Sequence, residues 1–374
     1  MTFTPFDLEY SQSLWEQQVE INLTESGVHP MRLEELIGDD PDLLQSLLET
    51  EINYPHVNGI PALRENIAAM YDGAGVENVL VTVGAAEANN IIMQTLMEPG
   101  DEFLTQTPTY KQVWGIAQNR RHTVNAFPML PEAGWALDVD DLNARVTART
   151  RIIAVVNPNN PTGYIMTPEE MDAVVAAADS VGAWILADEV YRGAERLQQE
   201  DTPSFFGRYD KVLAVGSMSK AYGLPGLRVG WVVGPPQAID DIWRRHEYTA
   251  ITASMLGNIL AAHALSPEVR PRIRDRARNY IRNGFKTMES WMATQDGLFE
   301  YTPPQASAVS FIRYNLAINS TELMERLIKE ESVFVGAGDS FGMDGHIRVA
   351  FGQEKAVLDR AFAGIERTLK RIQA

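Results

Sequence analysis

Short apolar runs alternate with longer helical segments between residues 79 and 233. The runs are rich in β-branched residues and end in polar, Gly or Pro residues; they are Val79–Val83, Glu102–Thr105, Ile152–Val156, Trp184–Ala187, Val212–Val215 and Val229–Val233. This alternation predicts an α/β fold in which helices sandwich a mostly parallel sheet. Because ligands bind beyond the carboxyl ends of such strands, the residues that follow each run are the first place to look for chemistry.

From about Pro271 the pattern changes. It predicts a charged helix over Arg272–Met292, a helix over Thr321–Glu331 and a final helix, together with strands over Ala308–Tyr314, at Phe334 and over Ile347–Phe351. This mixture is typical of a smaller α+β unit. We therefore expect a large domain over residues 46–274 and a small domain built from residues 1–45 and 275–374.

Composition and charge exclude several classes of function. The 374 residues include no cysteine, which excludes thiol chemistry and thiolate metal sites; we expect no metal site and a cytoplasmic location. The net charge of −18 repels nucleic acid and anionic membranes, so neither is an expected partner. No apolar run approaches the ~20 residues of a membrane span. Residues 1–20 carry acidic but no basic side chains, unlike an export signal.

The segment Gly216–Gly230, which reads GSMSKAYGLPGLRVG, follows the apolar run Val212–Val215 directly. It places Lys220 at the end of a strand among small and apolar neighbours, where a lysine can lose its proton more easily and condense with an aldehyde. Arg228 could pair bidentately with a phosphate. The alternative is a surface lysine in a Gly-rich loop. The glycine spacing does not match the dinucleotide-binding fingerprint.

This segment resembles the cofactor-lysine region of the class I and II aminotransferases, which are fold-type I pyridoxal-phosphate enzymes of the aspartate aminotransferase superfamily. The resemblance extends from about Asn22 to the C-terminus. It implies a sheet of the seven-stranded type and pyridoxal 5′-phosphate as the cofactor, held as a Schiff base by Lys220. It also implies that Ser217, Ser219 and Arg228 bind the cofactor, with Ser217 and Arg228 on its phosphate.

Two further motifs follow strand ends. The first, Asn157–Gly163, reads NPNNPTG, and the resemblance implies that Asn160 hydrogen-bonds the cofactor O3′ and approaches the substrate carboxylate. The second, Ala187–Tyr191, reads ADEVY; here the resemblance implies that Asp188 pairs with the pyridine nitrogen and Tyr191 bonds O3′. A structural turn and a helix cap are the respective alternatives, and Glu189 is expected to be structural.

The remaining cofactor contacts rest on shorter matches. In Val83–Glu87 the small residues Ala85 and Ala86 are expected to offer backbone N–H groups to the phosphate, although the family often has a hydroxyl residue in this loop. The resemblance also implies that Tyr110 stacks on the pyridine ring. Tyr54 is expected to reach the phosphate of a neighbouring subunit, which implies a homodimer with shared active sites.

Arg348 and Gly27 complete the predicted site on the substrate side. Arg348, in the strand-like segment His346–Phe351, matches the family's arginine that holds the substrate α-carboxylate, and Gly27 matches the segment that covers the substrate. The resemblance thus implies an aminotransferase that moves an amino group between an L-amino acid and a 2-oxo acid. Lys220 would act as the base, with Asp188 and Tyr191 tuning the cofactor.

The sequence leaves two alternative functions. A lyase or cyclase could use the same residues, and the segments Ser26–His29 and Ser219–Arg228 also resemble capreomycidine synthase, which cyclises a hydroxyarginine. Asp188 together with Tyr191 favours transamination. A cofactor-binding DNA regulator would need a basic helix-turn-helix segment, and the first 45 or so residues are acidic. Charged residues that could recognise a substrate side chain are Glu25, His29, Arg244, Arg245 and His246. The alternative for each is a solvated position at the surface or at an interface.

Overall fold

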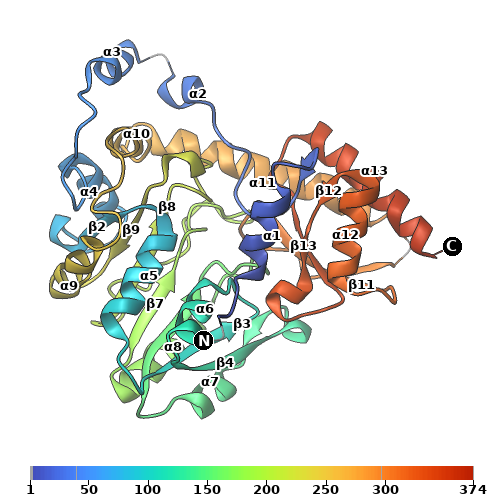
Figure 1. Cartoon of the computed structure of the whole chain (residues 1–374), viewed down its shortest axis with the longest axis horizontal. Helices are drawn as coiled ribbons and strands as arrows, with labels where there is room; N and C mark the ends of the chain where they lie inside the picture. Colours follow the sequence, from blue (N-terminus) through green and yellow to red (C-terminus); the bar gives the residue numbers. More distant parts are fainter. Residues whose placement is uncertain (1–2, 39, 296, 374) are drawn as a thin grey trace.

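An eight-stranded sheet forms the centre of the computed structural model, which describes residues 3–38, 40–295 and 297–373 (Figure 1). Its strands, in spatial order, are β2 (Val79–Thr82), β9 (Gly230–Val233), β8 (Val212–Ser217), β7 (Trp184–Asp188), β6 (Thr150–Val156), β3 (Glu102–Thr107), β4 (Thr123–Leu130) and β5 (Ala136–Leu137). The run from β8 to β4 is parallel, whereas β9 is antiparallel to both neighbours. The mostly parallel sheet is confirmed, with the two-residue β5 as an eighth strand.

Helices cover both faces of this sheet, as the continuous apolar runs predict. Successive residues of β6 alternate between faces: Ile152 and Ala154 lie in one apolar cluster, Ile153 and Val155 in another. The helices around the sheet are α4 (Pro61–Ala68), α5 (Gly84–Leu96), α6 (Gln112–Asn119), α7 (Val139–Arg145), α8 (Pro168–Val181), α9 (Pro236–His246) and α10 (Met255–Ala264). Burial on both faces explains why these strands lack polar alternation.

The C-terminal part contains a second, antiparallel sheet beside three long helices. Its strands are β10 (Phe299–Tyr301), β11 (Val309–Tyr314), β14 (His346–Ala350) and β13 (Gly336–Ala337), and its helices are α11 (Arg270–Met292), α12 (Ser320–Glu331) and α13 (Lys355–Gln373). Residues near the N-terminus join this part, because β1 (Ile21–Asn22) pairs in parallel with β12 (Val333–Phe334). The predicted boundary between residues 274 and 275 lies within α11, and the domain division remains a proposal.

The elements that were not predicted from the sequence include one strand and three helices. The strand β4 is only half-buried and contains Pro128, so it lacks the apolar run that marks the other strands. The helix α1 (Asp7–Trp15) buries only Leu8 and Gln12. The pair α2 (Leu33–Ile37) and α3 (Pro41–Glu49) projects from the rest of the chain, and α3 buries none of its residues (Figure 1).

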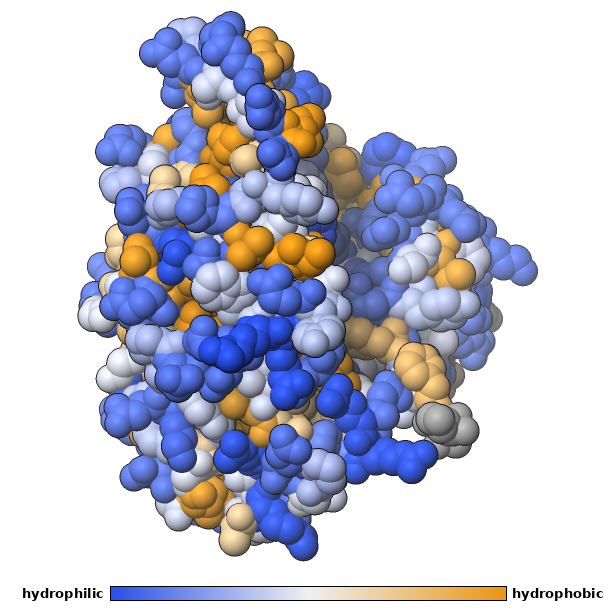
Figure 2. All heavy atoms as spheres, turned by 60° about the vertical axis from the view of Figure 1, so that its left-hand side comes forward, coloured by the Kyte–Doolittle hydropathy of each residue, from blue (hydrophilic) through white to orange (hydrophobic). Residues whose placement is uncertain are grey.

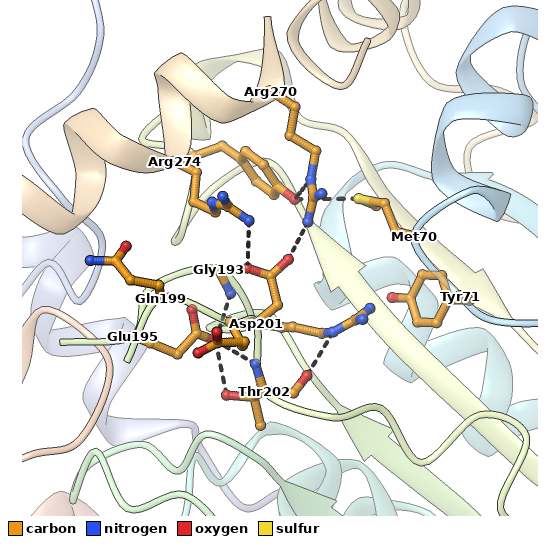
Figure 3. Close-up of polar contacts among 12 residues, drawn as sticks. Met70, Tyr71, Gly193, Glu195, Gln199, Asp201, Thr202, Arg270 and Arg274 are labelled. Carbon is orange, nitrogen blue, oxygen red and sulfur yellow. Dashed lines mark hydrogen bonds and ion pairs between the residues drawn. The ribbon is translucent and has the colours of Figure 1, made fainter. Parts of the chain in front are cut away.

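A buried cluster of charges fastens α11 to the long connection after β7 (Figure 3). Arg278 and Glu195 are both 0% exposed, and the Arg278 guanidinium pairs with Glu195 and, at 3.0 Å, with Asp201. Arg270 and Arg274 also bind Asp201, while the backbone and side chain of Thr202 donate to Glu195 at 2.8 and 2.9 Å. Each carboxylate oxygen in this cluster therefore has a donor, as buried charges require.

Within the described ranges, no helix is both long and apolar enough to span a bilayer.

Candidate active site

A cavity of about 330 Å³ lies at the carboxyl ends of the central strands, where the fold predicts a ligand. Residues at the ends of β2, β6, β7 and β8 meet there with Arg348 from β14 and the face of α1. The predicted site residues that line this cavity are Ala85, Ala86, Tyr110, Asn160, Asp188, Tyr191, Ser217, Ser219, Lys220, Arg228 and Arg348. The fold thus brings together motifs that are up to 263 residues apart in sequence, from Ala85 after β2 to Arg348 on β14.

Lys220 is held by a carboxylate that the sequence did not assign to it. The Lys220 Nζ donates to Glu25 Oε1 at 2.6 Å. Burial alone would lower the pKa of Lys220, but the charge and hydrogen bond of Glu25, together with the charges of Tyr191 and Glu9, outweigh burial and raise that pKa. In return, Lys220 overcomes the effect of burial on Glu25 and lowers the pKa of this carboxyl to about 2. The expectation that Lys220 loses its proton easily is therefore wrong for the chain without cofactor.

Asp188 ends β7 and lies at the base of the cavity. It accepts two long hydrogen bonds, one from Asn89 Nδ2 and one from the Val190 backbone, both 3.3 Å. Burial raises the pKa of Asp188 to about 6, because these donors and Lys220 compensate only part of the lost hydration. The carboxylate is therefore poised to accept a cation. Asn89 Oδ1 is also buried and has no hydrogen-bond partner within the described residues.

Arg348 and Asn160 form the opposite wall. Both are buried, and Arg348 Nη1 donates to Asn160 Oδ1 at 3.0 Å. Arg348 Nη2 donates to the carbonyl of Thr24, whereas its Nε finds no partner among the residues that the structure describes. A buried guanidinium with an unpaired N–H and no carboxylate bonded to it is suited to an anionic ligand.

The far end of the cavity is built for a phosphate. Arg228 has a left-handed backbone with φ of 51°, and its guanidinium lies so close to Gly84 that a Cβ there would be 2.8 Å from Nη2. Gly84 opens α5, a 13-residue helix whose first N–H groups face this end, followed by Ala85 and Ala86. Ser217 and Ser219 add hydroxyls that lie 3.0 Å apart. These donors form an anion-binding cup.

Two of the three predicted aromatic residues, Tyr110 and Tyr191, line the same cavity. The Tyr191 hydroxyl donates to Ser26 Oγ at 2.7 Å, and burial raises the pKa of Tyr191. The Tyr110 hydroxyl donates to Glu9 Oε1 at 2.7 Å, and the Phe6 ring packs edge-on against Tyr110 at 4.9 Å. Tyr110 is thereby fixed from its outer side by the N-terminal segment.

The N-terminal helix α1 supplies lining residues that the sequence reading missed. Glu9, Gln12 and Glu16 line the cavity, and Gln12 anchors the helix by donating to the Thr24 carbonyl at 3.1 Å. Figure 1 shows α1 between the central sheet and the C-terminal part. The spacing of three and four residues places the trio on one helical face, which is the signal that could have been used. The signal is weak because α1 has few apolar residues.

Other predicted residues lie outside the cavity. Gly27 packs on the backbone of Ser219 and Lys220, where a Cβ would be 2.9 Å from the Ser219 carbonyl oxygen, so its neighbours Glu25 and Ser26 line the cavity instead. Tyr54 is 75% exposed. His29, Arg244, Arg245 and His246 do not line the cavity; the first bonds Gln353, Arg244 pairs with Asp240, and His246 is buried against Glu87. Glu189 is buried and holds Ser204 and Phe205, in agreement with a structural role.

Comparison with known proteins gives the class of this chain. The family model described as aminotransferase class I and II matches residues 22–365, so the chain belongs to that family. Capreomycidine synthase of Streptomyces vinaceus is 31% identical over 363 residues, covering 94% of this chain and 90% of the relative. Aspartate aminotransferase of Pyrococcus horikoshii is 26% identical over 337 residues, covering 87% and 85%.

Solved structures agree with this assignment. A pyridoxal-phosphate-dependent aminotransferase from Streptococcus suis superposes with a TM-score of 0.93 and 30% identity, covering 100% of this chain and 99% of that one. The fold-type I architecture and the pyridoxal phosphate cofactor predicted from the sequence are therefore confirmed.

The residues of the cavity fit this cofactor. Arg228, Ser217 and the start of α5 can hold its phosphate, and the raised pKa of Asp188 suits a carboxylate that awaits a protonated ring nitrogen. Gly84 leaves room beside Arg228 that a side chain would fill. Lys220 lies on the same cavity wall and can reach an aldehyde. The individual contacts of each residue remain proposals.

Proposed function

We propose that this protein is an aminotransferase that moves an amino group between an L-amino acid and a 2-oxo acid. The observation that carries the proposal is the placement of Lys220, Asp188 and Arg348 around one cavity. These three groups correspond to the tasks of transamination: attachment of the cofactor, charge balance at its ring, and capture of the substrate carboxylate.

The chain's own residues would divide the work as follows. Arg348, already oriented by Asn160, binds the α-carboxylate with its unpaired N–H group. Bound pyridoxal phosphate supplies a ring that stabilises negative charge at the amino acid α-carbon. Lys220 Nζ would remove the proton from the substrate α-carbon, and the Asp188 carboxylate would pair with the protonated ring nitrogen.

Tyr191 and Ser26 form a hydrogen-bonded pair on the cavity wall that Lys220 also lines. Their 2.7 Å hydrogen bond lies on the cavity wall next to Glu25. Tyr191 can turn its hydroxyl toward the cofactor O3′ while Ser26 keeps the ring in place. This positions the phenol without a charged partner, since burial raises its pKa and keeps it neutral.

Cyclisation or elimination is the second candidate function. It is favoured by the 31% identity to capreomycidine synthase over 94% of this chain, and the cyclase would use the same lysine and aspartate. The two functions differ in what happens to the nitrogen. A transaminase leaves it on the cofactor, whereas a cyclase retains it in the product.

Incubation of the holo-protein with a panel of single amino acids distinguishes the two functions. Transamination predicts that at least one amino acid converts the bound cofactor stoichiometrically to pyridoxamine phosphate and releases the matching 2-oxo acid, both detectable by mass spectrometry. Adding 2-oxoglutarate or pyruvate should restore the aldehyde form. A product that retains its amino nitrogen, with no pyridoxamine phosphate from any amino acid, would reject transamination in favour of the second candidate.

We further propose that the active protein is a homodimer with shared active sites. The projection that carries α2 and α3 leaves large apolar side chains in solvent: Leu48 is 75% exposed and Ile52 84%, followed by Tyr54. In Figure 2 this projection, at the top of the view, carries apolar side chains among hydrophilic ones. Such a surface is typical of a region covered by another subunit. Light scattering should give twice the monomer mass, and Ile52→Asp should shift the protein toward monomers.

The cytoplasmic location expected from the absence of cysteines stays a prediction.

A further inference from the structure

The charges that line the cavity do not balance once the cofactor and the substrate carboxylate have taken their partners. Within the described residues, the lining cations are Lys220, Arg228 and Arg348, and the lining carboxylates are Glu9, Glu16, Glu25 and Asp188. Under the proposed function, each lining cation and Asp188 already has a task. Three carboxylates then remain, and only Glu25 has a cation bonded to it, the amine of Lys220.

The pairing of Glu25 ends when the lysine acts. The Lys220 amine cannot remain a full ammonium partner of Glu25 while it is bonded to the cofactor. While the Lys220 ammonium is bonded to it, Glu25 has a pKa of about 2, because that charge opposes the effect of burial. Loss of this ammonium leaves Glu25, whose side chain is 35% exposed toward the cavity, without its cation, and a cation of the ligand can take that place.

The helix α1 brings two more carboxylates to the same wall. Glu9 and Glu16 are seven residues apart, so they lie on one face about 10 Å apart along the helix axis. Glu9 already accepts from the Tyr110 hydroxyl through Oε1, which leaves Oε2 available. Neither Glu9 nor Glu16 forms a salt bridge among residues 3–38, 40–295 and 297–373. The covering helix therefore gives the cavity an acidic side.

A second observation in the same cavity points to a bound ligand. Arg348 is 1% exposed and its Nε has no partner within the described chain, although it lines the same cavity as the three glutamates. Burial lowers the pKa of Arg348, and the charges of Tyr191, Glu25 and Glu9 oppose that shift. Glu9 and Glu25 line the same cavity as Arg348. A ligand held here by its α-carboxylate thus extends toward carboxylates.

We propose that Glu9, Glu16 and Glu25 form a subsite for a cationic side chain, so that the preferred amino donor is a basic amino acid carrying a guanidinium or ammonium group. This inference rests on the proposed function for its orientation at Arg348. Acidic donors such as aspartate are disfavoured, because their side-chain carboxylate would meet three like charges. Donors with short apolar side chains leave those charges without a partner.

The decisive experiment compares two ligands that cannot react, because each lacks an α-amino group. One is 5-guanidinopentanoate and the other 5-ureidopentanoate, which has nearly the same shape but no charge. Isothermal titration calorimetry with the holo-protein should show about tenfold or tighter binding of the guanidino acid, as expected for a charged hydrogen-bonded pair in a partly buried site. This binding ratio does not depend on turnover, so it stands or falls separately from transamination.

Variants of Glu9 and Glu16 test whether the N-terminal helix α1 and its C-cap residue cause the difference in affinity between the two acids. Glu16→Gln and Glu9→Gln should each weaken binding of the guanidino acid several-fold and leave the ureido acid unchanged, and the double variant should bring the two affinities close together. Asp7→Asn is the control, because Asp7 is an exposed carboxylate on α1 outside the cavity lining. Equal affinities for the two acids in the unaltered protein, or a ratio that survives in the double variant, would overturn the proposal.

Discussion

Two aspartates in this chain, buried Asp188 and partly buried Asp201, have opposite electrostatic surroundings. Asp201 lies in the cluster that fastens α11, where Arg270, Arg274 and Arg278 outweigh the effect of burial and lower its pKa (Figure 3). Asp188 lies in the cavity, where burial prevails over two 3.3 Å hydrogen bonds and raises its pKa to about 6. The first carboxylate has its cations within the chain, and the second does not.

The difference separates a structural cluster from a binding site. In the α11 cluster each carboxylate is paired with arginine, so the ion pairs stabilise one arrangement of the chain, although the Nε atoms of Arg274 and Arg278 have no partner among the described residues. In the cavity, Asn89 Oδ1 and Arg348 Nε have no partner within the described residues, and the raised pKa of Asp188 reflects a carboxylate whose burial is not compensated. These groups destabilise the folded chain until a cofactor and a substrate bind them, as is usual for a preorganised site.

The largest expected effect comes from breaking the α11 cluster of charges. Arg278→Leu removes the cation that joins Glu195 and Asp201; Asp201 keeps Arg270 and Arg274, whereas Glu195 stays fully buried without a cation. Because an uncompensated buried charge is more costly than a lost pair, the free energy of unfolding should fall by about 3–5 kcal/mol. Urea denaturation measures this change.

A double variant provides the control for that prediction. Arg278→Leu combined with Glu195→Leu removes the charge together with its partner and should recover part of the lost stability. The folded fraction of either variant should still bind pyridoxal phosphate, since neither residue lines the cavity. A loss below about 1 kcal/mol in the single variant would contradict the view that this cluster is structural.

The next effect comes from removing the charge of Asp188. Asp188→Asn leaves the cofactor ring without its carboxylate, so kcat should fall by about 10²- to 10³-fold, as for the loss of one preorganised electrostatic partner. The new amide can donate to Asn89 Oδ1, which has no partner among the described residues. Retained cofactor binding with the reduced rate would be the expected pattern; an unchanged kcat would contradict the role of Asp188.

The same variant, which lowers activity, should raise the stability of the cofactor-free chain. The folded-state pKa of Asp188, about 6, lies above its ordinary value of 3.8, so its contribution to stability is complete below pH 3.8 and is lost as the pH rises through about 6. Without cofactor, Asp188→Asn should therefore be about 1–3 kcal/mol more stable than the unaltered chain at pH 8, with little difference near pH 4. Urea titrations at the two pH values test this.

A smaller effect is expected on the substrate side. Arg348→Lys keeps the charge but loses the fork that bonds Asn160 and leaves an N–H for the ligand. We expect kcat/KM for the amino acid to fall about 10- to 100-fold, mainly through KM. Cofactor binding should be unaffected, and a fall in kcat alone would assign Arg348 another task.

The smallest effect concerns the lysine. Glu25→Gln removes the carboxylate that raises the pKa of Lys220, so the cofactor-free chain should combine with pyridoxal phosphate at lower pH. At a fixed pH below the midpoint of the pH profile for cofactor recombination, the rate should rise about two- to fivefold. Asp7→Asn serves as a control of equal charge. A midpoint that moves to higher pH in Glu25→Gln would contradict the pairing.

Much of the large sheet and of the cofactor side could be predicted from the sequence. Continuous apolar runs mark β6, β7 and β8, and the residues just after them are the ones that line the cavity, including Asn160 and Lys220. Local pattern suffices here because a strand buried on both faces has few polar positions, so its end is easily recognised.

The parts that escaped prediction depend on tertiary contacts. The salt bridge between Glu25 and Lys220 joins residues 195 positions apart, and the expectation of an easily deprotonated lysine considered only its sequence neighbours. The helix α1 has a weak apolar stripe, so nothing local indicates that Glu9 and Glu16 cover the site. Half-buried β4 was missed for the same reason.

The central claim is that Lys220 carries the cofactor. Borohydride reduction of the holo-protein, followed by proteolysis and mass spectrometry, tests it most directly. We predict one pyridoxyl group per chain on the peptide that contains Lys220, and none on that position in Lys220→Arg. Labelling of another lysine, or no label in a protein that retains its cofactor, would contradict the account.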